Sequence, residues 1–168
     1  MSYNIVLIGF MGAGKTLIAK HLAIRLKRAV FSTDSQIVER EQRSIADIFR
    51  DSGESYFRQV EKVVVQEAAQ QHDAVIDCGG GIVLDPENIR ALKKTGVLFY
   101  LSATPREIYQ RIKDQTHRPL LHVPDPLRRI EDLLKERACF YAQADHVIAT
   151  EGQSPQKVCQ EIIDIMNL

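Results

Sequence analysis

Residues 9–16 have the spacing of a phosphate-binding loop. They run Gly-Phe-Met-Gly-Ala-Gly-Lys-Thr, which fits the pattern G-x-x-x-x-G-K-[ST] without a mismatch and adds a glycine at position 12. Glycines let the backbone curl so that successive N–H groups point at phosphate oxygens, and the next helix adds the positive end of its dipole. Lys15 would supply charge to the β- and γ-phosphates and Thr16 a hydroxyl to Mg²⁺. The loop predicts a nucleoside triphosphate site, but GTPases, ATPases and kinases all share it.

An acidic side chain, Asp34, is placed to act on an alcohol. It follows the apolar run Ala29–Phe31, which has the composition of a buried strand. The carboxyl ends of parallel strands are where such sheets bind ligands. Phosphate transfer to a hydroxyl needs a carboxylate that orients the hydroxyl and accepts its proton. The alternative is an N-cap for a helix beginning near Ser35.

Short apolar runs that alternate with helical patterns must position these residues. Runs that are apolar throughout are typical of strands buried on both faces of a parallel sheet. They lie at Ile5–Ile8, Ala29–Phe31, Ala74–Ile76, Val97–Leu101 and Val147–Ala149. Apolar residues recur at helical spacing between them, notably over residues 19–26 and from about 54 to 71. The pattern predicts an α/β fold in one domain (residues 1–168), a three-layer sandwich whose five-stranded parallel sheet is flanked by helices.

Local signals mark three helix starts and one long loop. Asp85-Pro86 and Ser154-Pro155 each place an N-cap before a proline at the first helical position. Thr104 and Glu107 have the spacing of a reciprocal capping box. Prolines at positions 119, 124 and 126 break any helix there, so this stretch is a plain connection or a functional lid. We expect a mobile lid over about residues 112–126.

The composition argues against large charged surfaces. Lys+Arg and Asp+Glu both number 22, so no concentrated basic surface for nucleic acid or a membrane is indicated. The N-terminal apolar run is too short for a signal peptide or a membrane span, and the three cysteines lack metal-ligand spacing. We therefore expect a cytoplasmic protein whose anionic ligands are held by a few placed cations, with neither nucleic acid nor membrane as a partner.

An ordered set of motifs carries a family resemblance. In chain order the set is Phe31-Ser32-Thr33-Asp34, Ser44–Phe49, Gly53–Glu61, Cys78-Gly79-Gly80-Gly81, Arg118-Pro119-Leu120-Leu121, and Arg137 with Tyr141. Together with the phosphate-binding loop, it closely resembles the shikimate kinases from Ile5 to about Pro155. The resemblance implies Mg²⁺-dependent transfer of the ATP γ-phosphate to the 3-hydroxyl of shikimate, giving shikimate 3-phosphate and ADP, in chorismate and aromatic amino acid biosynthesis. It also implies a monomer with a nucleoside monophosphate kinase-like fold and a substrate-binding helical region over about residues 34–61.

The resemblance assigns substrate binding to residues from several elements: Asp34, Phe49, Phe57, Arg58, Gly79, Gly80, Gly81 and Arg137. Asp34 matches the catalytic aspartate, and the arginines would bind the substrate carboxylate, which their planar forks fit. The glycines would let backbone N–H groups approach the ligand, and the phenylalanines would form aromatic walls. Simpler interpretations are a plain turn for the glycines, core packing for the phenylalanines, and helix ion pairs for the arginines. Those pairs would join Arg58 to Glu54 or Glu61, and Arg137 to Glu136 or Asp132.

The resemblance also implies a nucleotide site formed by Gly12, Ala13, Gly14, Lys15, Thr16, Leu17, Arg111, Arg118 and Gln153. Lys15 and the lid residue Arg118 would be catalytic, because cations near the transferring phosphate stabilise transition-state charge. Thr16 is the expected metal ligand. Near Gln153, capping of a helix by Ser154 is an equal explanation.

One position departs from the family pattern. Shikimate kinases usually carry Asp-Thr-Asp where this chain has Ser32-Thr33-Asp34, and the first aspartate helps to hold Mg²⁺, generally through water. Serine lacks the negative charge that attracts a hard cation. Three outcomes are open: Thr16 and the ATP phosphates suffice, Asp77 at the end of the third strand compensates, or the enzyme is slow or inactive. We expect an active enzyme with a raised Mg²⁺ requirement; strand alternation could turn Asp77 away from the site.

Two other functions fit parts of the pattern. A gluconate kinase or a nucleoside monophosphate kinase would share the phosphate-binding loop, although the three glycines and the Arg-Pro-Leu-Leu segment favour a shikimate kinase. A regulatory nucleotide-binding module that has lost catalysis would explain Ser32. The presence of Lys15, Asp34, Arg58 and Arg137 counts against that module.

Overall fold

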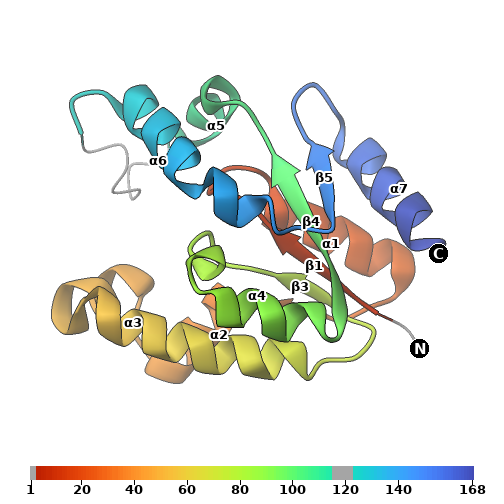
Figure 1. Ribbon diagram of the computed structural model, residues 1–168, viewed down its shortest axis with the longest axis horizontal. Coiled ribbons are helices and arrows are strands. Elements are labelled where there is room, and N and C mark those ends of the chain that lie inside the picture. Colours follow the sequence, from red (N-terminus) through yellow and green to blue (C-terminus); the bar gives the residue numbers. More distant parts are fainter. Residues whose placement is uncertain (1–2, 115–122) are drawn as a thin grey trace.

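A five-stranded parallel sheet forms the centre of the protein, in a computed structural model that describes residues 3–114 and 123–168. The strands are β1 (Asn4–Ile8), β2 (Val30–Ser32), β3 (Val75–Asp77), β4 (Gly96–Ser102) and β5 (His146–Ala149). They lie in the order β2-β3-β1-β4-β5, and every pairing is parallel (Figure 1). The predicted sheet is therefore confirmed.

Helices cover both faces of the sheet and complete the three layers. One face packs against α1 (Lys15–Leu26) and α7 (Pro155–Met166), and the other against α3 (Ile45–Ala69), α4 (Pro86–Lys93) and α6 (Pro126–Tyr141) (Figure 1). Alternate residues of β1 serve the two layers, since Ile5 and Leu7 face α1 while Val6 and Ile8 face α3 and α4. The remaining helices are α2 (Thr33–Glu41), η1 (Ile82–Leu84) and α5 (Pro105–Ile112).

The connections after β1 and β3 leave the sheet in opposite directions. The loop after β1 leads into α1 on one face, whereas the segment after β3 leads through η1 into α4 on the other. These strands are neighbours, and a crevice at the carboxyl ends of such a pair is the usual ligand site of an open α/β sheet. The fold therefore brings the phosphate-binding loop and the three-glycine segment to one place.

The predicted helix caps are present. The side chains of Asp85, Thr104 and Ser154 accept hydrogen bonds from backbone N–H groups in the first turns of α4, α5 and α7. The reciprocal half of the capping box at Thr104 was a wrong expectation, because the Glu107 carboxylate accepts from Arg111 Nε at 2.9 Å. Glu107 thus pairs with Arg111, a residue of the expected nucleotide site.

The two edge strands and one helix differ from the predicted pattern. The edge strands are more exposed than predicted, because each has only one neighbouring strand: most of β5 is exposed (Val147 60%), and in β2 Val30 is 42% exposed while Phe31 and Ser32 are half-buried. The helix predicted from about residue 54 begins earlier, at Ile45, and is interrupted at Gly53. Gly53 has φ +81°, a backbone conformation that residues other than glycine rarely adopt. The region predicted to bind substrate (34–61) is thus formed by α2 and the kinked first half of α3.

Two expectations concern the lid and membrane spans. Residues 115–122 of the predicted lid (112–126), including Arg118, lie outside the described residues. Over residues 3–114 and 123–168, no helix has both the length and the apolar character needed to cross a bilayer.

Candidate active site

The phosphate-binding loop curls between β1 and α1. Gly12 (φ +78°) and Gly14 (φ +98°) adopt left-handed backbone conformations, and Gly14 is the N-cap of α1. Lys15 Nζ donates hydrogen bonds to the carbonyl oxygens of Gly9 (2.8 Å) and Phe10 (3.1 Å). The ammonium group therefore lies across the loop, where the predicted phosphates would bind. Of the other two residues in the expected nucleotide site, Ala13 is buried and Leu17 is exposed.

Thr16 is joined to Asp77, at the end of β3. The threonine hydroxyl donates to Asp77 Oδ2 at 2.7 Å, so strand alternation does not turn Asp77 away from the site. The aspartate is 6% exposed, and burial raises its pKa against the opposing effects of the Thr16 hydrogen bond and the Lys15 charge. Thr16, the expected metal ligand, is therefore in direct contact with Asp77, the acid considered as a possible replacement for the missing aspartate.

The residues around the loop fit a divalent ion that arrives with a triphosphate. Hard cations prefer oxygen ligands, which Thr16 and Asp77 provide, and Mg²⁺ is usually completed by substrate phosphates and water. Within the described ranges, no three His, Cys, Asp or Glu side chains gather into a metal-binding group. The described part of the chain therefore offers too few ligands of its own and suits a metal–nucleotide complex.

Asp34 lies in the first turn of α2, beside Gly79. The N-cap of α2 is Ser32, whose hydroxyl accepts from Ser35 N at 3.4 Å, so the interpretation of Asp34 as the cap was wrong. A Cβ atom on Gly79 would collide with the Asp34 carboxylate, which shows how closely the acid approaches the glycine segment. Gly79 N donates to Thr33 Oγ1 at 2.9 Å and ties this segment to the start of α2. The acid is therefore held against the segment that follows β3.

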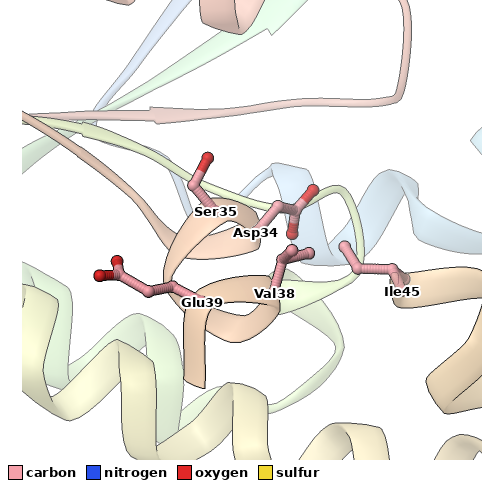
Figure 2. Close-up of a pocket in the computed structure, with 5 residues that line it drawn as sticks. All are labelled: Asp34, Ser35, Val38, Glu39 and Ile45. Carbon is pink, nitrogen blue, oxygen red and sulfur yellow. The ribbon is translucent and has the colours of Figure 1, made fainter. Parts of the chain in front are cut away.

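Asp34 also lines an open hollow of about 350 Å³ beside α2. Its other lining residues are Ser35, Val38, Glu39 and Ile45 (Figure 2). In this view the Glu39 carboxylate points away from Asp34. All of these residues fall in the region 34–61 expected to bind substrate, and Asp34 is the one that the sequence analysis named individually as a site residue.

Arg58 projects from α3 to the same glycine segment. A Cβ atom on Gly81 would collide with its guanidinium group. The helix ion pairs considered as the alternative are also present, to Glu61 Oε2 (2.6 Å) and Glu54 Oε1 (3.2 Å). Glu61 is 2% exposed; burial raises its pKa, although the Arg58 charge pulls it down. Sequence reasoning had treated Glu61 as a surface partner, whereas it is a buried support for Arg58.

Arg137 reaches the glycine segment from α6. Its Nη1 donates to Gly80 O at 3.4 Å, and its guanidinium lies 5.6 Å from the centre of the Phe10 ring. The helix pairs considered for it do not form: Asp132 pairs with Arg128 at 3.5 Å, and Glu136 lies 3.9 Å from Arg129. Within the described ranges Arg137 has no ion pair, which leaves its charge available to a ligand.

Phe49 and Phe57 form an aromatic pair beside Arg58. Their ring centres are 4.6 Å apart, and the Arg58 guanidinium lies 5.2 Å from the centre of the Phe57 ring. Phe57 is buried in a small core with residues of α2 and α3, while Phe49 is 37% exposed. Core packing therefore explains Phe57 by itself but not Phe49.

Arg111 fastens α5 to the phosphate-binding loop. It donates to the carbonyl oxygens of Gly12 (3.3 Å) and Ala13 (3.2 Å) and to Thr150, a buried residue that the sequence analysis missed. Gln153 Nε2 donates to Ala149 O at 2.8 Å, within the loop that leads to the Ser154 cap of α7. No sequence signal pointed to Thr150, because its contact with Arg111 joins positions far apart in the chain.

Comparisons with known proteins identify the family of the chain. The family model for shikimate kinase matches residues 11–167. The chain is 43% identical to the shikimate kinase of Caldicellulosiruptor saccharolyticus (96% of this chain and 94% of that one) and 46% identical to that of Symbiobacterium thermophilum, with the same coverage. A solved structure of shikimate kinase from Acinetobacter baumannii in complex with shikimate superposes with a TM-score of 0.93 at 34% identity, covering 99% of this chain and 94% of that one. The chain belongs to the shikimate kinase family of ATP-dependent phosphotransferases.

Proposed function

We propose that this chain uses Mg²⁺ and ATP to phosphorylate the 3-hydroxyl of shikimate, and that the crevice between β1 and β3 is where it does so. The observation that carries this assignment is the convergence of Asp34, Arg58 and Arg137 on the segment 79–81. That segment abuts the phosphate-binding loop, since a Cβ on Gly80 would lie 3.7 Å from both Gly9 O and Met11 N. An acid and two cations thus face the acceptor position beside the nucleotide position.

The two arginines give the acceptor side its charge preference. Guanidinium groups bind carboxylates through parallel hydrogen bonds, and Arg58 and Arg137 come from different helices to neighbouring glycines. A cyclic acid held there by its carboxylate would present a hydroxyl group toward Asp34. The exposed Phe49, with the buried Phe57, would supply an apolar wall for the ring.

In the proposed reaction the acceptor oxygen attacks the γ-phosphorus of ATP. The bond between that phosphorus and the β–γ bridging oxygen breaks, and ADP leaves with the bonding electron pair. Asp34 orients the hydroxyl and takes its proton, while Lys15 stabilises charge on the phosphates. Magnesium would neutralise phosphate charge when bound. Thr16, Asp77 and the loop N–H groups supply the surroundings for that metal–nucleotide complex.

Other residues of the nucleotide site have supporting roles in this proposal. Arg111 holds the loop through the carbonyl oxygens of Gly12 and Ala13, and Gln153 lies in the loop before α7, where the adenine would bind. We expect Arg118 to enter from a lid over about residues 112–126 and to add charge near the transferred phosphate.

The cellular setting is also part of the proposal. We expect the chain to act as a monomer in the cytoplasm, where shikimate would be its partner. The free thiols of Cys78, Cys139 and Cys159 agree with a reducing compartment. Sedimentation of the purified protein at micromolar concentration would reveal a stable dimer if this expectation is wrong.

The acceptor is tested by measuring ADP release with shikimate, gluconate and AMP offered in turn. Turnover with shikimate alone is the expected result, because two arginines and an apolar wall select a cyclic acid. Turnover with gluconate or AMP would assign the chain to another group of small-molecule kinases. Nucleotide binding without turnover on any acceptor would favour a module that has lost catalysis.

Replacing Arg58 with alanine should affect both the substrate and the fold. The KM for shikimate rises while ATP affinity barely changes, since Arg58 lies at the acceptor side. Stability falls by about 2 kcal/mol at pH 8, because the buried Glu61 carboxylate loses its cation. Without the cation, the pKa of folded Glu61 rises further above its ordinary value of 4.5. The folded variant then binds more protons than the unfolded chain, so its loss of stability grows as pH rises and is smaller at pH 5 than at pH 8.

The control for this variant is Arg50→Ala on the same helix. Arg50 is exposed and pairs with Asp47 and Asp51, so its loss should leave the free energy of unfolding nearly unchanged, because solvent screens exposed ion pairs. Urea denaturation at the two pH values and steady-state kinetics provide the measurements. An unchanged KM in Arg58→Ala would mean that Arg58 does not bind the substrate and serves only in helix ion pairs. Equal destabilisation at both pH values would mean that the loss of stability does not come from Glu61.

A further inference from the structure

Ser32 and Asp77 occupy neighbouring positions at the carboxyl ends of two paired strands. The parallel register of β2 and β3 pairs Val30 with Val75 and Ser32 with Asp77. Residues directly paired in a parallel sheet point to the same face, and adjacent strands are about 4.8 Å apart. An acid at either position would therefore approach the same end of the sheet from the same side.

The face in question is the one that carries the phosphate-binding loop and α1. Val75 packs into the core on the α1 side, and alternation along β3 puts Asp77 on that side as well. The Thr16–Asp77 hydrogen bond of 2.7 Å confirms this direction. Because β3 lies between β2 and β1, Asp77 is one strand nearer to the loop than Ser32.

Ser32 has a different local role. Its hydroxyl accepts a hydrogen bond from Ser35 N at 3.4 Å and caps α2, whose first turn carries Asp34. This cap needs an acceptor oxygen but no charge. Ser32 therefore keeps the capping hydrogen bond at the position where the family usually carries an aspartate, but it lacks the negative charge. Asp77 supplies a carboxylate on the neighbouring strand.

We propose that Asp77 is the metal-site carboxylate of this chain and stands in for the aspartate missing at position 32. With Thr16 and the nucleotide phosphates, it holds the divalent ion directly or through a water molecule, as the acid after a strand does in many P-loop proteins. The proposal rests on the nucleotide site described under the proposed function. It replaces the expectation of a raised Mg²⁺ requirement, since the charge is relocated and not lost.

The test measures Mn²⁺ binding to the enzyme–ADP complex by the loss of the free-ion electron paramagnetic resonance signal. ADP affinity is measured separately in EDTA, so the nucleotide site is assessed without metal. The proteins are wild type, Asp77→Asn, Ser32→Asp and the variant with both changes. Asparagine keeps the size of Asp77 and an oxygen for Thr16 but removes the charge. Asp73→Asn is the matched control, since Asp73 precedes the same strand, is 57% exposed and pairs with Arg28.

Asp77→Asn should weaken Mn²⁺ binding to the ADP complex by about tenfold to a hundredfold, while ADP affinity in EDTA changes by about threefold or less. Ser32→Asp should recover most of that loss in the Asp77→Asn background, because the two positions share one face. In the otherwise unchanged protein it should alter Mn²⁺ affinity by about threefold or less, since an acid is already present. Asp73→Asn should match wild type.

Two results would overturn the proposal. One is an Asp77→Asn protein that binds ADP and retains wild-type Mn²⁺ affinity. The other is a gain of about tenfold from Ser32→Asp alone, which would mean that the wild-type site lacks its acid. The second result decides the matter even if Asp77→Asn does not fold. A wild-type protein that fails to bind ADP in EDTA would instead refute the proposed function itself, and this inference with it.

Discussion

Asp34→Asn lowers kcat for shikimate by about a thousandfold, the size expected when a positioned general base is lost. The substitution keeps the shape of the side chain and removes its ability to accept a proton. The acid lies so close to Gly79 that a Cβ atom at that position would collide with it, which places the carboxylate at the glycine segment. KM should change little, because the arginines provide most of the binding. Steady-state kinetics with saturating ATP measures both constants.

Glu39→Gln is the control for Asp34→Asn. Glu39 lines the same hollow and belongs to the same helix but points away from Asp34 (Figure 2). It should leave kcat within about twofold of wild type, since exposed substitutions away from the chemistry have small effects. Equal losses from the two variants would indicate that charge near α2, and not proton transfer at Asp34, controls the rate.

Arg137→Ala raises the KM for shikimate by about a hundredfold, which corresponds to about 3 kcal/mol for a charge-assisted interaction with a carboxylate. This variant separates binding from folding better than Arg58→Ala does. Arg137 has no acidic partner among the described residues, so its removal leaves no buried carboxylate without a cation. ATP affinity should remain unchanged, because Arg137 meets the glycine segment and not the loop carbonyls.

Arg129→Ala on the same helix is the matched control for Arg137→Ala. Arg129 lies near Glu136 at 3.9 Å and is partly exposed, so its loss should have no measurable effect on KM. A second measurement uses an analogue of shikimate in which an amide replaces the carboxylate. The wild-type preference for the acid should largely disappear in Arg137→Ala. If the preference persists in full, Arg137 does not bind the carboxylate.

The short segment 79–81 explains why the loss of kcat in Asp34→Asn and the rise of KM in Arg137→Ala are expected from one site. Its glycines lie against Asp34, the loop backbone and Arg58 in turn, and its middle carbonyl accepts from Arg137. Side chains at positions 79 and 81 would occupy the space of the acid and of one arginine. Close approach by the acid and the arginine therefore disfavours a side chain at positions 79 and 81, whereas a Cβ at position 80 would meet the loop backbone at an ordinary contact distance of 3.7 Å.

Much of the fold could be predicted because its signals are local. Apolar runs of strand length, helical spacing between them and three N-caps together identified the five strands and most helix starts. The phosphate-binding loop is equally local, since all its residues lie within eight positions. Errors occurred where tertiary context decides exposure or geometry, as in the exposed edge strand β5 and the kink at Gly53.

The acceptor site depended on more than local sequence. The family resemblance named Arg58, Arg137 and the glycines, and their assigned roles stay predictions. Isolated helix patterns favoured ion pairs for both arginines: these pairs form for Arg58 and not for Arg137. The structure also shows that Ser32 is the N-cap of α2, a role that the sequence analysis had considered for Asp34.

The sequence by itself determined the alternation of strands and helices, the phosphate-binding loop and the family, because each depends on residue types at fixed spacing. Only the tertiary structure decided which distant side chains meet. Thr16 reaches Asp77 across 61 positions of sequence, and Arg137 reaches Gly80 across 57. Such contacts follow from strand order and from the face toward which each side chain points, and both are set by packing of the whole sheet between its helices.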